Sequence, residues 1–178
     1  LWTIPVNQDD SGLRGGNPEL FRQRAAPEVD RVFEAGPMFS PDGRWLAYVS
    51  NESGSVQVFV RAFPDRGGKW QISNDGGNLP VWSRSGHELF FRSPDSKIMV
   101  ANYTVKGDSF VPERPRTWSE KPIADLGPPV STFDIAPDGK RVVALMPAES
   151  QTEQQSQNHV IFLENFADEL RRRVPLGK

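Results

Sequence analysis

Residues 37–50 form the first copy of a segment that recurs twice in the chain, and they read Pro37-Met38-Phe39-Ser40-Pro41-Asp42-Gly43-Arg44-Trp45-Leu46-Ala47-Tyr48-Val49-Ser50. The second copy is Pro80-Val81-Trp82-Ser83-Arg84-Ser85-Gly86-His87-Glu88-Leu89-Phe90-Phe91-Arg92-Ser93, and the third is Phe133-Asp134-Ile135-Ala136-Pro137-Asp138-Gly139-Lys140-Arg141-Val142-Val143-Ala144-Leu145-Met146. Their matching glycines are spaced 43 and 53 residues apart. A repeat of this length indicates successive copies of one supersecondary unit.

Each copy begins with a turn. In Ser40–Gly43, proline presets φ at the second turn position, aspartate suits the third, and glycine accepts the left-handed conformation that follows. Ala136–Gly139 repeats this pattern. Ser83–Gly86 loses the proline and aspartate but keeps the glycine, whose left-handed geometry is the hardest to replace. Each turn therefore predicts a short hairpin between two antiparallel strands.

A nearly continuous apolar run follows each turn, at Trp45–Val49, Leu89–Phe91 and Val142–Met146. Such a run is typical of a strand that is covered on both faces, whereas a buried helix would need a longer run. The segments between the copies supply further strands. We expect third strands at Val56–Phe63, Ile98–Val105 and His159–Leu163, and fourth strands at Lys69–Ser73 and Arg116–Ser119.

The sequence thus predicts an all-β chain, a β-propeller segment of four-stranded antiparallel blades with about three blades' worth of strands. Leu1–Val6 and Glu19–Arg22 are expected to be the third and fourth strands of an earlier blade. A short helix is expected at Phe166–Arg173. The predicted parts are an outer half-blade (1–24), two blades (35–78 and 79–120), a partial blade (130–165), and a C-terminal helix and tail (166–178).

Composition limits the classes of function that this chain can have. The chain has 178 residues, a net charge of −2 and no cysteine, which argues against general affinity for nucleic acid and excludes disulfides and thiolate metal sites. No apolar run is long enough to cross a bilayer, so membrane insertion is not expected. The opening Leu1–Val6 resembles the middle of a strand, so we expect a fragment or processed form, and the compartment stays open.

An open arc of blades would leave unpaired edge strands. Two solutions are open. A longer parent protein can supply the missing blades, or two copies can meet head-to-tail. In a homodimer, Leu1–Arg22 of one copy would complete the last blade of the other and close a six-bladed ring with two-fold symmetry.

The hairpin motif, the apolar run and the period together resemble the WD-like propeller repeats of the TolB-like family, over about Ala35 to Leu163. The ending Leu163–Pro175 is similar to the C-terminus of propeller segments in large bacterial proteins, several of which carry a serine/threonine kinase domain upstream. The resemblance implies a periplasmic or extracytoplasmic scaffold or sensor. It also implies a relation to the propeller that covers the hydrolase domain of prolyl oligopeptidases.

Catalytic patterns are absent from the sequence. His87 follows a turn glycine and is expected to be exposed, and His159 begins a strand; neither belongs to a Gly-x-Ser-x-Gly motif. Asp42 and Asp138 are explained by turn geometry rather than by calcium binding. Trp45, Trp70 and Trp82 are expected to pack between blades. We therefore expect no catalytic residue, no metal site and no cofactor.

The expected role is non-catalytic binding of a protein or small ligand by loops at one propeller face, namely 51–54, 74–78, 94–97 and 127–131, together with the central channel. Three alternatives remain: a propeller subdomain of a peptidase-type enzyme or of a hydrolase or lyase with its site in the channel, a sensor segment of a kinase, and a gene fragment without a role. The candidate partner-binding residues are Asn51, Glu52, Ser53, Asp75, Asn78, Asp95 and Asp134.

Overall fold

The chain is all-β, as predicted. The computed structural model describes residues 1–21, 32–127 and 130–148, and every regular element within them is a β-strand. The chain divides into two units, Leu1–Pro147 and Ala148–Lys178. The strand expected at His159–Leu163 and the helix expected at Phe166–Arg173 lie outside the described residues.

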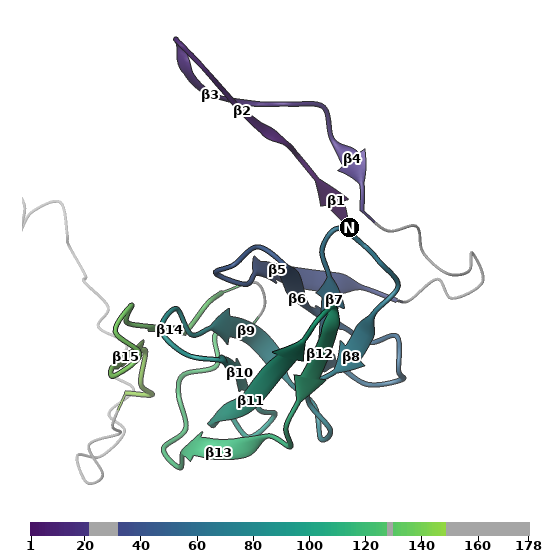
Figure 1. Ribbon diagram of the computed structural model, residues 1–178. Helices are drawn as coiled ribbons and strands as arrows, with labels where there is room; N and C mark the ends of the chain where they lie inside the picture. Colours follow the sequence, from purple (N-terminus) through teal and green to yellow (C-terminus); the bar gives the residue numbers. More distant parts are fainter. Residues whose placement is uncertain (22–31, 128–129, 149–178) are drawn as a thin grey trace, which may run out of the picture. The chain divides into compact units, whose positions relative to one another are not determined.

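Two larger antiparallel sheets make up most of the first unit (Figure 1). The first sheet contains, in spatial order, β5 (Glu34–Phe39), β6 (Trp45–Ser50), β7 (Gln57–Ala62) and β8 (Lys69–Gln71). The second contains β9 (Asn78–Trp82), β10 (Glu88–Arg92), β11 (Ile98–Lys106) and β13 (Arg116–Ser119), with β12 (Ser109–Pro112) paired to the far end of β11. The third and fourth strands expected after the first and second copies therefore form, as β7 and β8 and as β11 and β13, and in each sheet the fourth strand pairs with the third.

The remaining strands form three small antiparallel pairs. These are β1 (Trp2–Thr3) with β4 (Glu19–Leu20), β2 (Val6–Asp9) with β3 (Gly12–Gly15), and β14 (Phe133–Ile135) with β15 (Val142–Ala144). Within the described residues the sheets do not close into a ring. A set of small antiparallel sheets is thus the architecture that the structure shows.

A hydrophobic core joins the two larger sheets. In β6, Trp45, Ala47 and Val49 belong to this core, and in β10 Leu89 and Phe91 meet them from the other sheet. Because successive side chains of a strand point to opposite faces, Phe90 lies in a second core, which β10 and β11 share with β14. The first two apolar runs are therefore buried on both faces, as predicted. Burial of each large apolar side chain stabilises the fold by about 1.5–3 kcal/mol.

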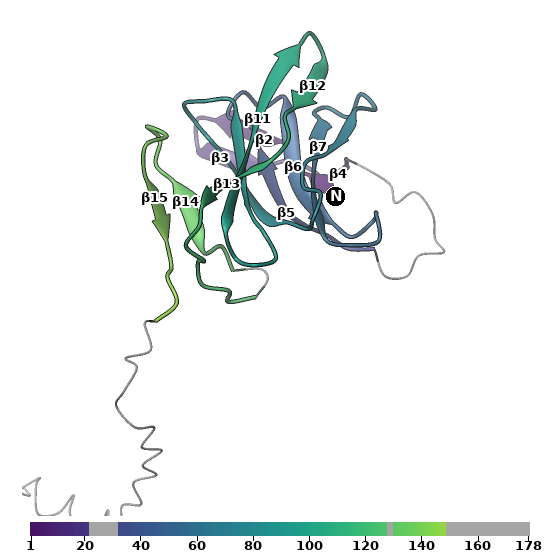
Figure 2. The ribbon, with the colours of Figure 1, turned by 90° about the horizontal axis from the view of Figure 1, so that it is seen from below.

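Aromatic rings fill the centre of the first core. Trp45 and Trp82 are buried in this core and the partly buried Trp70 packs against it, so all three tryptophans take part in packing, as expected. Phe110 comes from the β11–β12 hairpin, which extends past the other strands of its sheet (Figure 2). Its ring centroid lies 5.2 Å from that of Trp45 and 4.6 Å from that of Tyr103. The hairpin thereby ties the second sheet to the first.

The third apolar run differs from its prediction. Only Val142–Ala144 is a strand, and Val143, Leu145 and Met146 are 69%, 49% and 52% exposed. β15 pairs with β14 alone among the described strands, and only its Val142 and Ala144 pack against the second core. The expectation of a continuously buried strand over Val142–Met146 was therefore wrong.

The three turns also differ from one another. Gly43 and Gly139 have positive φ angles of 69° and 66°, and each closes its turn by donating to the carbonyl three residues earlier. Gly86 does not adopt a positive φ. Its N–H instead donates to the Ser83 hydroxyl at 3.2 Å, a bend that forms without the proline and aspartate of the other copies. The left-handed geometry expected at Gly86 is thus not found.

The N-terminal segment is more divided than expected. Leu1–Val6 is interrupted at Ile4-Pro5, since proline has no N–H to donate to a strand ladder. The β2–β3 hairpin, which the sequence reading missed, extends the β1–β4 pair. Its turn at Asp9–Gly12 is closed by the Asp9 side chain, which accepts hydrogen bonds from the N–H and hydroxyl of Ser11. We call residues 1–21 the arm.

Candidate binding site at the loop edge of the second sheet

The loop at residues 73–77 is held by one buried side chain. Gln57, which is 4% exposed, accepts hydrogen bonds from the Ser73 hydroxyl and from the Gly76 N–H. Its amide nitrogen donates to the Asn74 carbonyl at 3.2 Å and to the Ser55 hydroxyl at 3.0 Å. A buried, fully hydrogen-bonded amide fixes local geometry. Gln57 therefore links the loop after β6 to the loop after β8.

The loop between β10 and β11 is also preorganised. The Ser93 hydroxyl accepts from the Lys97 N–H at 3.1 Å and donates to Asp95. This hydroxyl hydrogen bond is the main reason that the pKa of Asp95 lies below its usual value. Lys97 bridges Glu120 at 2.9 Å and Asp95 at 3.4 Å, and the pKa of Lys97 is raised by these two carboxylates, most by Glu120.

Two glycines allow these loops to touch. A Cβ on Gly76 would lie 2.6 Å from Cγ of Pro94, and one on Gly77 would lie 2.9 Å from the ring of Phe91. Gly76 also has a φ of 96°, which favours glycine. The Asn74–Asn78 turn therefore packs directly on the next sheet: a side chain at Gly76 would push it away from Pro94, and one at Gly77 would push it away from Phe91 of β10.

Between these loops and β13 lies a cavity of about 510 Å³, which is within the usual size range of ligand pockets. Its apolar wall contains Phe91, Met99, Pro94 and Pro115. Its charged groups are Asp75, Asp95, Lys97 and Arg114. The remaining lining residues are Asn74, Gly76, Ser93 and Thr117.

The charged groups of the cavity differ in what they can offer a ligand. Lys97 is already paired with Glu120 and Asp95, and Asp95 also accepts a hydrogen bond from Ser93. Asp75 and Arg114 are exposed, and within the described part of the chain neither forms an ion pair. The cavity thus presents one available carboxylate, one available guanidinium and an apolar wall. This combination can bind a peptide segment or a small molecule that carries both polar and apolar groups.

Two of the predicted residues, Asp75 and Asp95, are brought together in this cavity. Others have structural contacts instead. Asn51 accepts a hydrogen bond from the Phe33 N–H at 2.9 Å, and Glu52 pairs with Lys69 at 3.2 Å. Ser53 is exposed in the same loop.

Asn78 supports the second sheet. Its side-chain oxygen accepts from Nε of Arg92, a buried guanidinium that also pairs with Asp125 at 2.7 Å. A hydrogen bond from the Gly127 N–H lowers the pKa of Asp125, and a second hydrogen bond from Arg92 lowers it further. This network ties β9 and β10 to the segment after β13, so Asn78 positions elements near the cavity without lining it.

Asp134 lies apart from the other candidates. It is exposed and caps the Ile135 N–H at 2.8 Å, and it lines a smaller cavity of about 230 Å³ beside Arg84. The structure therefore does not group Asp134 with Asp75 and Asp95 in one cavity.

Arg114 was missed by sequence reading. It lies in Pro112-Glu113-Arg114-Pro115, between β12 and β13, and only the fold brings this segment beside the Asn74–Asn78 loop. The two flanking prolines are the signal that could have identified a rigid connection worth examining. Nothing local to this segment indicates its neighbour.

The described residues contain no cluster of three or more histidine and acidic side chains that could hold a metal ion. His87 is exposed, as expected, and its ring lies 5.3 Å from that of Tyr103. His159 lies outside the described residues. Asp42 and Asp138 accept backbone hydrogen bonds from the residues two positions later, as their turn positions predict. In the same described ranges, no helix is long and apolar enough to cross a membrane.

No protein-family model matches the sequence, and no curated protein is significantly similar to it. By its structure the chain is an all-β protein of small antiparallel sheets, with a preformed cavity at a loop edge.

Proposed function

We propose that the chain is a non-catalytic binding module, built as a segment of a β-propeller, and that it recognises a peptide segment of a protein partner through the 510 Å³ cavity. The propeller architecture is supported by the first sheet, in which the four strands follow one another in space in their order along the chain, and by the same order of β9, β10 and β11 in the second sheet. It is further supported by the cores that lie between β6 and β10 and between β10 and β14.

The observation that carries the binding role is the cavity itself. Its walls come from the loops after β8 and β10, the fourth strand of one sheet and the second strand of the next, and both loops are held by partly buried hydrogen bonds. A rigid site loses little conformational entropy when it binds. A peptide suits the site because Phe91 and Met99 can contact an apolar side chain while Asp75 and Arg114 engage polar groups of the chain.

A displayed random-peptide library selected on the purified chain tests this proposal. We expect selected peptides to bind the double variant Asp75→Asn/Arg114→Gln about tenfold or more weakly, because hydrogen bonds to charged groups contribute about 1.5–3 kcal/mol each. The matched control is Arg84→Gln/Asp134→Asn, which makes the same chemical changes at the 230 Å³ cavity. Calorimetric titration of each selected peptide measures the affinities.

Three results would count against the proposal. Equal affinity for the wild type and the Asp75/Arg114 variant would remove the cavity from the binding surface. A loss confined to the Arg84/Asp134 variant would move the site to the smaller cavity. Failure to select any binding peptide would reject peptide recognition.

A further inference from the structure

The outer edge of β13 is open. This strand pairs with β11 on one side and, among the described strands, with none on the other. In an edge strand, alternate backbone N–H and C=O groups point away from the sheet and can pair with another chain. The edge lies beside the 510 Å³ cavity, since Pro115 and Thr117 both line it. A strand added to β13 would therefore have side chains within reach of the cavity.

The two faces of β13 differ. Thr117 lines the cavity. The preceding residue, Arg116, pairs with Val100 of the second core, so its side chain lies on the opposite face. The Trp118 ring centroid lies 5.9 Å from that of Phe90, which belongs to the same core, yet Trp118 is 42% exposed. An added strand would thus meet an apolar cavity on one face and a guanidinium and an indole on the other.

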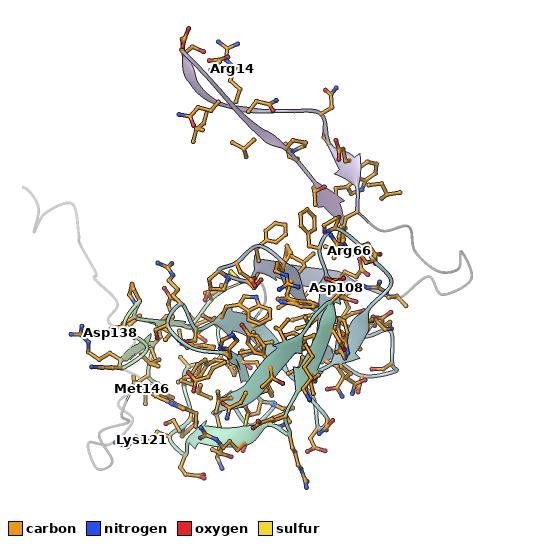
Figure 3. The ribbon with its side chains drawn as sticks, in the orientation of Figure 1. Arg14, Arg66, Asp108, Lys121, Asp138 and Met146 are labelled. Atoms are coloured by element: carbon orange, nitrogen blue, oxygen red, sulfur yellow. The ribbon has the colours of Figure 1, made fainter. Side chains whose placement is uncertain are left out.

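The side chains around this edge carry positive charge that is not neutralised. Three exposed cations flank or belong to β13 and form no ion pair within the described part of the chain, namely Arg114, Arg116 and Lys121. Lys121 is labelled beside the end of β13 in Figure 3. Glu120 is already paired with Lys97 at 2.9 Å. Glu113 accepts a hydrogen bond from Asn102 at 3.4 Å. The edge therefore attracts a negatively charged segment.

An acidic peptide fits this edge better than two other occupants. A second copy of β13 would bring Arg116 close to the cations of its partner, and like charges on paired strands destabilise the pair. A single-stranded nucleic acid has no backbone groups that match a strand edge, and Asp75 and Asp95 beside the edge would repel its phosphates. A peptide offers both a complementary main chain and, through its acidic side chains, the opposite charge.

We propose that β13 binds an extended acidic peptide by strand addition. The main chain of the peptide pairs with the free edge of β13, apolar side chains enter the cavity against Phe91 and Met99, and the acidic side chains that alternate with them meet Arg116. Apolar residues face the cavity because Asp75 and Asp95 repel acidic ones there. The inference rests on the proposed peptide-binding function and names the class of peptide and its mode of binding.

Synthetic peptides test the class of ligand. The probe is a peptide of about eight residues, the length of an ordinary strand, in which glutamate alternates with valine. The matched control replaces each glutamate with lysine. We expect calorimetric titration to show binding of the glutamate peptide that weakens with added salt, and at least tenfold weaker binding of the lysine peptide.

Methylation of single backbone nitrogens of the glutamate peptide tests strand addition. Only every second N–H of an added strand donates to the edge strand. We therefore expect N-methylation to weaken binding about tenfold at alternate positions and to have little effect at the positions between them. A uniform effect, or no effect at any position, would reject strand pairing, because a peptide held by side chains alone has no such alternation.

Arg116→Gln separates this inference from the proposed function, because Arg116 does not line the cavity. The variant is expected to bind the glutamate peptide about two- to fivefold more weakly, as for an exposed ion pair. Its affinity for a peptide with glutamine in place of glutamate is expected to equal that of the wild type. Arg84→Gln is the matched control, since Arg84 is also exposed, and it is expected to bind both peptides normally.

Four other outcomes decide the proposal. No binding of the glutamate peptide, or equal binding of the lysine peptide, would overturn it. Tighter binding of a thymidine oligonucleotide would make the edge a nucleic-acid surface. A homodimer that the glutamate peptide dissociates would make a second copy the occupant. If Asp75→Asn/Arg114→Gln binds the peptide normally while the alternation and the Arg116 effect persist, strand addition is supported and the cavity is rejected as the binding site.

Discussion

The second and third copies of the repeat have similar sequences but different surroundings. In the second copy, Leu89, Phe90 and Phe91 are at most 2% exposed, because one core covers each face of β10. In the third copy, Val143 and Leu145 follow a well-formed turn yet remain exposed. The hairpin is therefore a local product of its turn residues, whereas burial depends on the sheets that stack on either side.

The largest predicted effect comes from replacing one leucine with alanine in each of these two copies. Leu89→Ala is expected to lower the free energy of unfolding by about 2–5 kcal/mol, because a fully buried leucine is lost and a cavity is left. Leu145→Ala, at 49% exposure, is expected to cost less than about 1 kcal/mol. Urea unfolding followed by tryptophan fluorescence measures both. Equal costs would show that Leu145 is as covered as Leu89 under the conditions of measurement.

An alkaline titration probes the core between the two larger sheets. Burial raises the pKa of Tyr103 to about 12, from the 10.0 that is usual for a tyrosine. The folded chain then keeps this proton more tightly than the unfolded chain, so the contribution to stability is complete below pH 10 and is lost as pH rises towards 12. The free energy of unfolding is expected to fall by about 1–3 kcal/mol between these two pH values because of Tyr103.

Tyr103→Phe is the control for this titration. Tyr48 is the second tyrosine of the chain and is unchanged in the variant, so the difference between the two unfolding curves isolates Tyr103. We expect the variant to lose less stability between pH 10 and pH 12. Parallel curves for wild type and variant would contradict a buried Tyr103, as would tyrosinate absorbance that appears near pH 10 for both rings.

Much of the fold follows from local signals in the sequence. The turns at Gly43 and Gly139, the paired strands of the two larger sheets and the tryptophan core could be predicted, because turn chemistry and apolar runs act over a few residues. The β2–β3 hairpin has a readable turn signal in Asp10-Ser11-Gly12 that was overlooked. The β11–β12 hairpin likewise turns at Gly107, whose φ is 62°.

The candidate site was less accessible to sequence reasoning. The loops at 74–78 and 94–97 could be placed at one edge by counting strands, which correctly brought Asp75 and Asp95 together. Arg114 could not be found this way, because its position depends on how the β12 strand diverts the chain before β13. Asn51 and Glu52 were chosen as loop residues, yet their hydrogen bonds and ion pair are with this chain's own residues.

The smallest predicted effect is found by replacing with alanine two glycines that occupy the same position in the repeat. Gly43→Ala places a side chain on a residue with a φ of 69°, which is expected to cost about 1–2 kcal/mol of unfolding free energy. Gly86→Ala imposes no such conformation, and the new methyl group would meet the flexible Glu88 carboxylate at 3.2 Å. Its effect is expected to lie within about 0.5 kcal/mol of zero, because alanine restricts the unfolded chain more than glycine does. Chemical denaturation of the two variants compares them directly. A similar loss of unfolding free energy at both positions would mean that Gly86 adopts the left-handed conformation of Gly43. The hydrogen bond to the Ser83 hydroxyl would then not be a substitute for that conformation.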